Sequence, residues 1–188
     1  PPRQGLYYFE LSSAQTQTLL DENRNPAGLS ADGSLAASTQ AEAVVDGSPL
    51  RLHNLSSAET AADFALQEGM NRGAGYAVFS ADGKTLVTQG QRDDLSLRVW
   101  DTKTGELRSV IQIPAEDDSR RSNSWFNSRE GSYGVAAVSR DGSLVVTRDH
   151  AKFVVWNCGA QRPVAILPAQ KHTIASFSPN ARHVVTAG

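Results

Sequence analysis

A short segment recurs four times along the chain, and this repetition restricts the possible fold more than any other feature of the sequence. Each copy contains an apolar residue, a serine, a polar turn and a short apolar strand. The serines stand at positions 30, 80, 139 and 178, so successive copies are 50, 59 and 39 residues apart. Such periods are typical of repeat architectures built from one supersecondary unit. The copies are LSADGSLAAS (29–38), FSADGKTLVT (79–88), VSRDGSLVVT (138–147) and FSPNARHVVT (177–186).

The turn inside each copy has the chemistry of a β-hairpin. Asp-Gly between two strand-like runs is a strong hairpin signal, because glycine accepts the positive φ that closes the turn. The fourth copy has Asn180-Ala181 instead, and alanine tolerates the left-handed region poorly. We therefore expect this copy to be slightly strained or to use another turn. The other three pairs are Asp32-Gly33, Asp82-Gly83 and Asp141-Gly142.

A second pair of strands follows each of the first three copies. An alternating strand ends in an aromatic residue, and a turn then leads into another β-rich run. One unit thus consists of four short strands, A to D, which predicts an all-β fold. The best helical candidate is 57–69, which can also be a strand with a polar lead-in. The aromatic strands are 95–105, 151–159 and, with His53 in place of tryptophan, 49–59; the runs 106–113 and 162–167 follow two of them.

The stretch FSADGKTLVTQG, followed by DLSLRVWDTKTGEL, resembles a WD-repeat, the unit of a β-propeller. Trp100-Asp101 is the WD pair, Asp94 stands at the usual tight turn before strand C, and Trp156 is the second aromatic of this kind. His172 stands at the family's Gly-His histidine, although Lys171 replaces the glycine. The resemblance implies four-stranded antiparallel blades. The histidine position holds Arg24, Ala74 and Tyr133 in the other units, so the family's His–Ser–Asp–Trp hydrogen-bond network is expected to be mostly absent.

The units divide the chain into about four blades' worth of strands. A partial blade with strands C and D comes first, three blades follow, and strands A and B of another come last. We expect a segment of a larger ring, with the remaining blades elsewhere on the same polypeptide or on another. Two alternatives remain open: the leading and trailing pairs join into a composite blade within one chain, or two chains close an eight-bladed ring. The segments are 5–20, 26–66, 75–113, 134–167 and 172–188.

Composition narrows the classes of partner. The formal net charge of −2 argues against a nucleic-acid platform, which normally carries a basic excess. No apolar run approaches the length of a membrane helix, so no membrane partner is expected. The single cysteine, Cys158, and the lack of a signal-peptide pattern predict a cytoplasmic protein. No motif indicates a metal or cofactor, and Cys158 is predicted to be an ordinary turn residue.

The insertion 114–134 is the candidate partner-binding segment. It contains neighbouring aromatic residues among arginines, which is the composition of an interface hot spot. The alternative is that the aromatic side chains pack on a neighbouring blade while the arginines are solvated. In a propeller this insertion would share one face with 67–75. The candidate residues are Arg120, Arg121, Trp125, Phe126 and Arg129.

Three functions follow as hypotheses. The resemblance favours a non-catalytic scaffold that docks a protein or peptide on its loop-bearing face. A second hypothesis is the sensor region of a larger signalling ATPase or kinase, which a nucleotide-binding domain in the full reading frame would support. An enzyme with a catalytic centre in the channel is disfavoured, because the A strands offer almost no ligands; they carry Tyr76, Val78, Val135, Ala137 and Ser176.

Overall fold

The described part of the chain is built entirely from β-strands and turns, which confirms the all-β prediction. The computed structural model describes residues 7–10, 15–18, 24–40, 50–55, 59–64, 74–90, 96–114, 134–148, 152–168 and 174–187. None of these residues lies in a helix, and therefore none lies in a helix long and apolar enough to cross a membrane. Residues 59–64 of the candidate helix 57–69 form the strand β6 (Glu59–Phe64), as the strand alternative expected.

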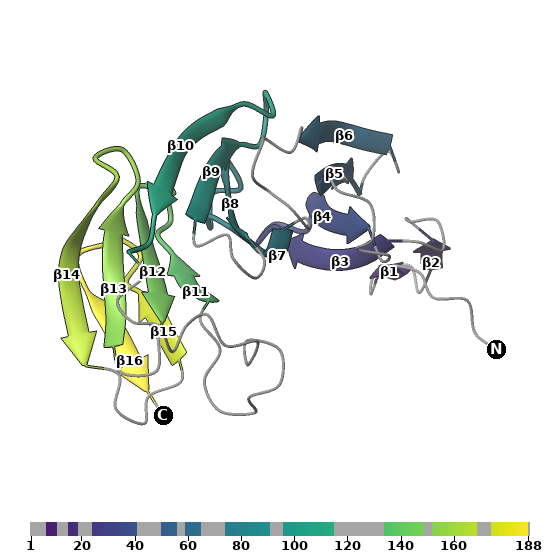
Figure 1. Cartoon of the computed structure of the whole chain (residues 1–188). Coiled ribbons are helices and arrows are strands. Elements are labelled where there is room, and N and C mark those ends of the chain that lie inside the picture. Colours follow the sequence, from purple (N-terminus) through teal and green to yellow (C-terminus); the bar gives the residue numbers. More distant parts are fainter. Residues whose placement is uncertain are drawn as a thin grey trace, which may run out of the picture.

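In the described part of the chain, sixteen strands form five separate antiparallel sheets, which we number I to V in chain order (Figure 1). Sheets II, III and IV have four strands each, in sequential order, whereas sheets I and V have two. Sheet I is β1 (Tyr7–Glu10) and β2 (Gln15–Thr18); sheet II is β3 (Arg24–Leu29), β4 (Leu35–Gln40), β5 (Leu50–Asn54) and β6; sheet III is β7 (Ala74–Phe79), β8 (Thr85–Gly90), β9 (Ser96–Asp101) and β10 (Leu107–Gln112); sheet IV is β11 (Gly134–Val138), β12 (Leu144–Arg148), β13 (Lys152–Asn157) and β14 (Arg162–Pro168); sheet V is β15 (Ile174–Phe177) and β16 (Val184–Ala187).

The hydrophobic core is divided into three clusters, and each cluster lies between two consecutive sheets. Leu52 of sheet II packs with Leu86 and Trp100 of sheet III. The opposite face of sheet III, with Val87, packs on Trp156 of sheet IV. A third cluster joins sheets IV and V. Both faces of the four-stranded sheet III are therefore covered, which explains why its central strands carry consecutive apolar residues rather than strict alternation.

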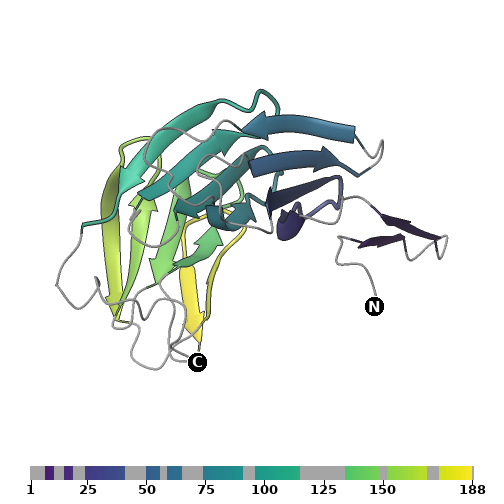
Figure 2. The same cartoon turned by 45° about the vertical axis from the view of Figure 1, so that its right-hand side comes forward.

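The first strands of the units lie next to one another. Strand β7 contacts both β3 and β11, and β11 also contacts β15. Gly28 of β3 shows how close this approach is, because a β-carbon added there would lie 2.4 Å from the backbone oxygen of Ala77 in β7. Only glycine permits this separation. The sheets consequently fan out from a row of inner strands and form an open arc, with sheet I and sheet V at its two ends (Figure 2).

Candidate functional site at the turn-bearing edge

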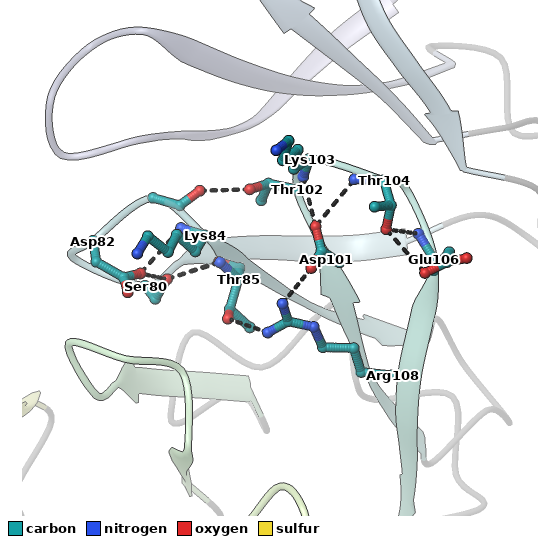
Figure 3. A network of polar contacts seen from close by, with 11 residues as sticks. Ser80, Asp82, Lys84, Thr85, Asp101, Thr102, Lys103, Thr104, Glu106 and Arg108 are labelled. Atoms are coloured by element: carbon teal, nitrogen blue, oxygen red, sulfur yellow. Dashed lines mark hydrogen bonds and ion pairs between the residues drawn. The ribbon is translucent and has the colours of Figure 1, made fainter.

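Each A–B turn is held by a serine and a carboxylate that share their hydrogen bonds. In sheet III the Ser80 hydroxyl donates to Asp82 Oδ1 over 2.7 Å and accepts from the Thr85 amide over 3.0 Å. The same Asp82 oxygen accepts the Lys84 amide at 3.0 Å (Figure 3). Two side chains thereby satisfy backbone amides that the turn would otherwise leave without partners.

This arrangement repeats in all four A–B turns. The serine hydroxyl donates a hydrogen bond to the side chain two residues later, at 2.7–2.8 Å. It accepts a hydrogen bond from the backbone amide five residues later, at 2.9–3.0 Å. Asn180 of sheet V replaces the aspartate with an amide oxygen and keeps both of its bonds. The four pairs are Ser30 with Asp32, Ser80 with Asp82, Ser139 with Asp141, and Ser178 with Asn180.

The carboxylates of these turns are acidic for the same reason. Hydrogen bonds from Ser30 and Ser34 stabilise the charged form and lower the pKa of Asp32 from 3.8 to about 2. The amide and hydroxyl of Ser143, with the Ser139 hydroxyl, likewise lower the pKa of Asp141. Both residues are therefore ionised at neutral pH, and their carboxylates accept the hydrogen bonds that hold the turns.

The C–D turn of sheet III is organised by Asp101, the aspartate of the WD pair. Its Oδ1 accepts the amides of Lys103 at 2.8 Å and Thr104 at 3.0 Å. Its other carboxylate oxygen forms an ion pair with Arg108 (Figure 3). The Thr104 amide first, and then Lys103 and Arg108, lower the pKa of Asp101. Asn157 plays the corresponding part in sheet IV, where it accepts the Ala160 amide at 2.8 Å.

In each four-stranded sheet, further hydrogen bonds link the C–D turn to the A–B turn on the same edge. The Thr102 amide donates to the Lys84 carbonyl at 3.1 Å, and its hydroxyl donates to the Gly83 carbonyl at 2.7 Å. Cys158 takes the place of Thr102 in sheet IV, and its amide donates to the Ser143 carbonyl at 2.9 Å. Its thiol is buried, and burial raises the pKa of Cys158 to about 11. The thiol is therefore protonated at neutral pH, as expected for a structural cysteine.

Neighbouring turns also contact each other between sheets. The Asp82 amide donates to the Arg140 carbonyl at 3.0 Å. A β-carbon on Gly142, in the next turn, would lie 2.4 Å from Thr85 in sheet III. This edge therefore presents closely packed, hydrogen-bonded turns, with Lys84, Lys103 and Arg140 exposed to solvent.

The aromatic residues of the third strands lie inside the sheets. The Trp100 indole donates to the Thr88 hydroxyl at 2.9 Å, and the Trp156 indole donates to Thr147 at 2.8 Å. His53 is buried on β5 and lies 2.7 Å from the Ser38 hydroxyl. It thus stands in for tryptophan, as the sequence indicates. Each four-stranded sheet therefore has a buried hydrogen bond between side chains of its second and third strands.

The structure describes most of the repeat residues but none of the candidate partner-binding residues. The described repeat residues lie at the edge that carries the A–B and C–D turns, or just inside it. They are Asp82, Gly83, Trp100 and Asp101 in sheet III, and Asp141, Gly142 and Trp156 in sheet IV. Asp94 and His172 lie outside the described residues, as do residues 67–73 of segment 67–75 and the candidate binding residues Arg120, Arg121, Trp125, Phe126 and Arg129.

Sequence reasoning missed the part that the serines play. The hairpin argument rested on Asp-Gly, whereas the serine two residues earlier closes the turn by donating and accepting. The serine recurs in all four copies, and this recurrence could have indicated its role in the turn.

The described residues contain no group of three or more His, Cys, Asp or Glu side chains able to hold a metal ion. The A–B and C–D turns of the described sheets thus form an edge of hydrogen-bonded polar turns. No protein-family model and no curated protein sequence matches this chain.

Proposed function

We propose that the sheets are consecutive blades of a WD-repeat-like β-propeller, part of a larger ring, and that the chain is a non-catalytic scaffold for a protein or peptide partner. One observation carries the proposal. Each four-stranded sheet packs face to face on the next, while the inner strands β3, β7, β11 and β15 lie in a row. Radial packing of this kind is the arrangement that propellers use.

The turn network supports a scaffold role. The Ser–Asp bonds and the links between A–B and C–D turns fix one edge of sheets II, III and IV. The clusters on both faces of sheet III fix the sheets against each other. A stack held in this way keeps the strand ends at its opposite edge at constant separations, which lowers the entropic cost of binding a partner there. A cytoplasmic location belongs to the same proposal.

The proposed docking segment connects sheets III and IV. Insertion 114–134 leaves β10 and enters β11, and this connection belongs to the edge opposite the A–B and C–D turns. Its Trp125 and Phe126 supply the rigid apolar area of a hot spot, and Arg120 and Arg121 supply charged donors. Docking there leaves the hydrogen-bonded turns unchanged.

A photocrosslinking experiment tests this proposal. A benzophenone amino acid replaces Phe126 in one variant and the exposed turn residue Thr104 in a control. We expect Phe126 to yield one crosslinked protein in cells, and the substitutions Arg120→Ala and Arg121→Ala to reduce its yield about tenfold. Equal labelling from both positions, or labelling that the arginine substitutions leave unchanged, contradicts docking at the insertion.

A further inference from the structure

Strand β14 forms the outer edge of sheet IV, and its exposed side chains are largely apolar. It is the last of the four strands in the sheet order and has no further neighbour among the described strands (Figure 1). Ile166 is 63% and Val164 49% exposed. An unpaired strand edge presents a row of backbone N–H and C=O groups, which another strand can use for pairing.

The exposure of Ile166 arises between two four-stranded sheets. Ile166 pairs with Val154, which packs in the cluster between sheets III and IV. Residues paired across two strands project from the same face of the sheet, so Ile166 lies on the face turned towards sheet III. Sheets III and IV both have four strands. The small size of sheet V therefore does not account for the exposed isoleucine.

The outer strands of sheets II and III contain charged residues, whereas most of β14 contains none. Strand β6 includes Glu59 and Asp63, and β10 includes Arg108. Charges on an edge strand hinder its pairing with another chain. After Arg162, all remaining residues of β14 are uncharged. Of these three outer strands, β14 is therefore the one whose composition allows a further strand to pair.

We propose that β14 pairs in an antiparallel arrangement with β14 of a second copy of this chain. The partner strand has to be extended, unpaired on one edge and uncharged, because a charge placed against Val164 and Ile166 would lose its hydration. Among the three outer strands just compared, β14 itself meets these conditions. A two-fold axis at Ala165 places Val164 opposite Ile166 of the second copy, so that both apolar side chains gain a neighbour. Pro163 and Pro168 lack N–H groups and limit the pairing to the residues between them.

This contact is self-complementary and small. Because both copies use the same strand, the contact is complete in a dimer and does not extend into a fibre. The segment between the two prolines is short, so it buries less than the roughly 1,200 Å² of a stable interface. We therefore expect a reversible dimer whose population rises with protein concentration. The inference does not depend on docking at 114–134.

A single introduced cysteine tests the pairing and its register. Ala165 is exposed, and Ala165→Cys places the thiols of two copies opposite each other on the two-fold axis, close enough for a disulfide. We expect mild oxidation to give a covalent species of twice the chain's mass. The control Gln112→Cys introduces an exposed thiol on β10, the outer strand of sheet III, and should give little of this species. Cys158 is buried and does not compete. Equal yields from both variants would overturn the pairing, because random collision would then explain them.

Light scattering over a concentration series up to about 1 mM is the second measurement. We expect the mass of the unmodified chain to rise towards that of a dimer, and the mass of Ile166→Lys to remain that of a monomer. Ile166 is exposed, so this variant should fold, and an unchanged urea midpoint would verify it. Gln112→Lys adds the same charge to β10 and should dimerise as the unmodified chain does. A chain that stays monomeric, or a dimer that Ile166→Lys leaves intact, would overturn the proposal. Either result leaves docking at 114–134 to its own photocrosslinking test.

Discussion

Left-handed backbone is the residue-scale feature that recurs through the turns. Four glycines adopt φ values of 70–73°. Gln161 (φ 53°) and Ala181 (φ 55°) adopt the same conformation without being glycine. Gln161 occupies the position of Gly105 in the C–D turn, and Ala181 that of Gly83 in the A–B turn. The strain expected at Ala181 is therefore confirmed, and the turn type is retained.

Replacing these two residues by glycine should stabilise the protein. A left-handed L-residue costs about 1–2 kcal/mol, and the extra backbone entropy of glycine returns part of the gain. We expect Ala181→Gly and Gln161→Gly each to raise the free energy of unfolding by about 0.5–1 kcal/mol, measured by urea denaturation. The control Ala81→Gly changes an exposed alanine in an A–B turn with ordinary φ, and it should destabilise. Loss of stability in all three variants would contradict the argument.

Two glycines with almost the same φ should respond differently to alanine. Gly83 has no atom within 4 Å of a β-carbon built on it, whereas the β-carbon on Gly142 would lie 2.4 Å from Thr85. We expect Gly83→Ala to cost about 1–2 kcal/mol for its backbone alone. Gly142→Ala should cost about 1–3 kcal/mol more, because buried Thr85 must move. Equal urea midpoints for the two variants would show that the turn relaxes away from sheet III.

At the scale of strands and turns, the sequence predicted what is encoded locally. Asp82-Gly83 and the alternating run before Trp100 specify a turn and a strand from neighbouring residues alone, and both are found. The left-handed Gln161 could not be predicted, because nothing next to it favours that conformation; the pairing of β13 with β14 imposes it. The candidate site at 114–134 remains a prediction, since its aromatic and arginine residues are outside the described part of the chain.

The A–B turn of sheet II should make stability sensitive to acid. The pKa of Asp32 is lowered to about 2 in the folded protein, so its contribution is complete above pH 4 and is lost as pH falls towards 2. Asn180 shows that an amide oxygen supports the same turn. We expect Asp32→Asn to lower the urea midpoint at pH 7, because the amide keeps the turn but not the charge that its hydrogen bonds stabilise, and to lessen the decrease of the midpoint between pH 4 and 2. An identical acid dependence in both proteins would exclude this role.

The hydrogen bond between strands B and C of sheet IV should contribute strongly to stability. Thr147→Val keeps the shape of the side chain and removes the acceptor of the buried Trp156 indole. We expect a loss of about 1–3 kcal/mol in the free energy of unfolding, because the indole N–H loses its acceptor within the core. Thr104→Val is the matched control, as it changes an exposed threonine of a turn, and it should alter stability by less than about 0.5 kcal/mol. Equal losses in both variants would contradict the prediction.

At the scale of the whole molecule, the buried apolar side chains that stabilise the fold lie between neighbouring sheets. The three clusters join sheets II and III, III and IV, and IV and V, so among the described residues each core cluster is shared by two sheets. Stability is then a sum of unit and nearest-neighbour contributions, as in other repeat proteins. Sheet V, where Ile174 is 63% and Val185 66% exposed, should therefore be less stable than the four-stranded sheets.

This coupling predicts that one substitution between two sheets weakens both of them. Ile111 on β10 is fully buried in the cluster that also contains Val145 and Trp156 of sheet IV. We expect Ile111→Ala to lower the free energy of unfolding by about 2–5 kcal/mol and to accelerate amide hydrogen exchange in β8 and β12 together. Ile166→Ala, at an exposed position on β14, should leave both strands unchanged. Faster exchange confined to sheet III would mean that the sheets unfold independently, and the chain would then act as separate hairpin units rather than as one rigid scaffold.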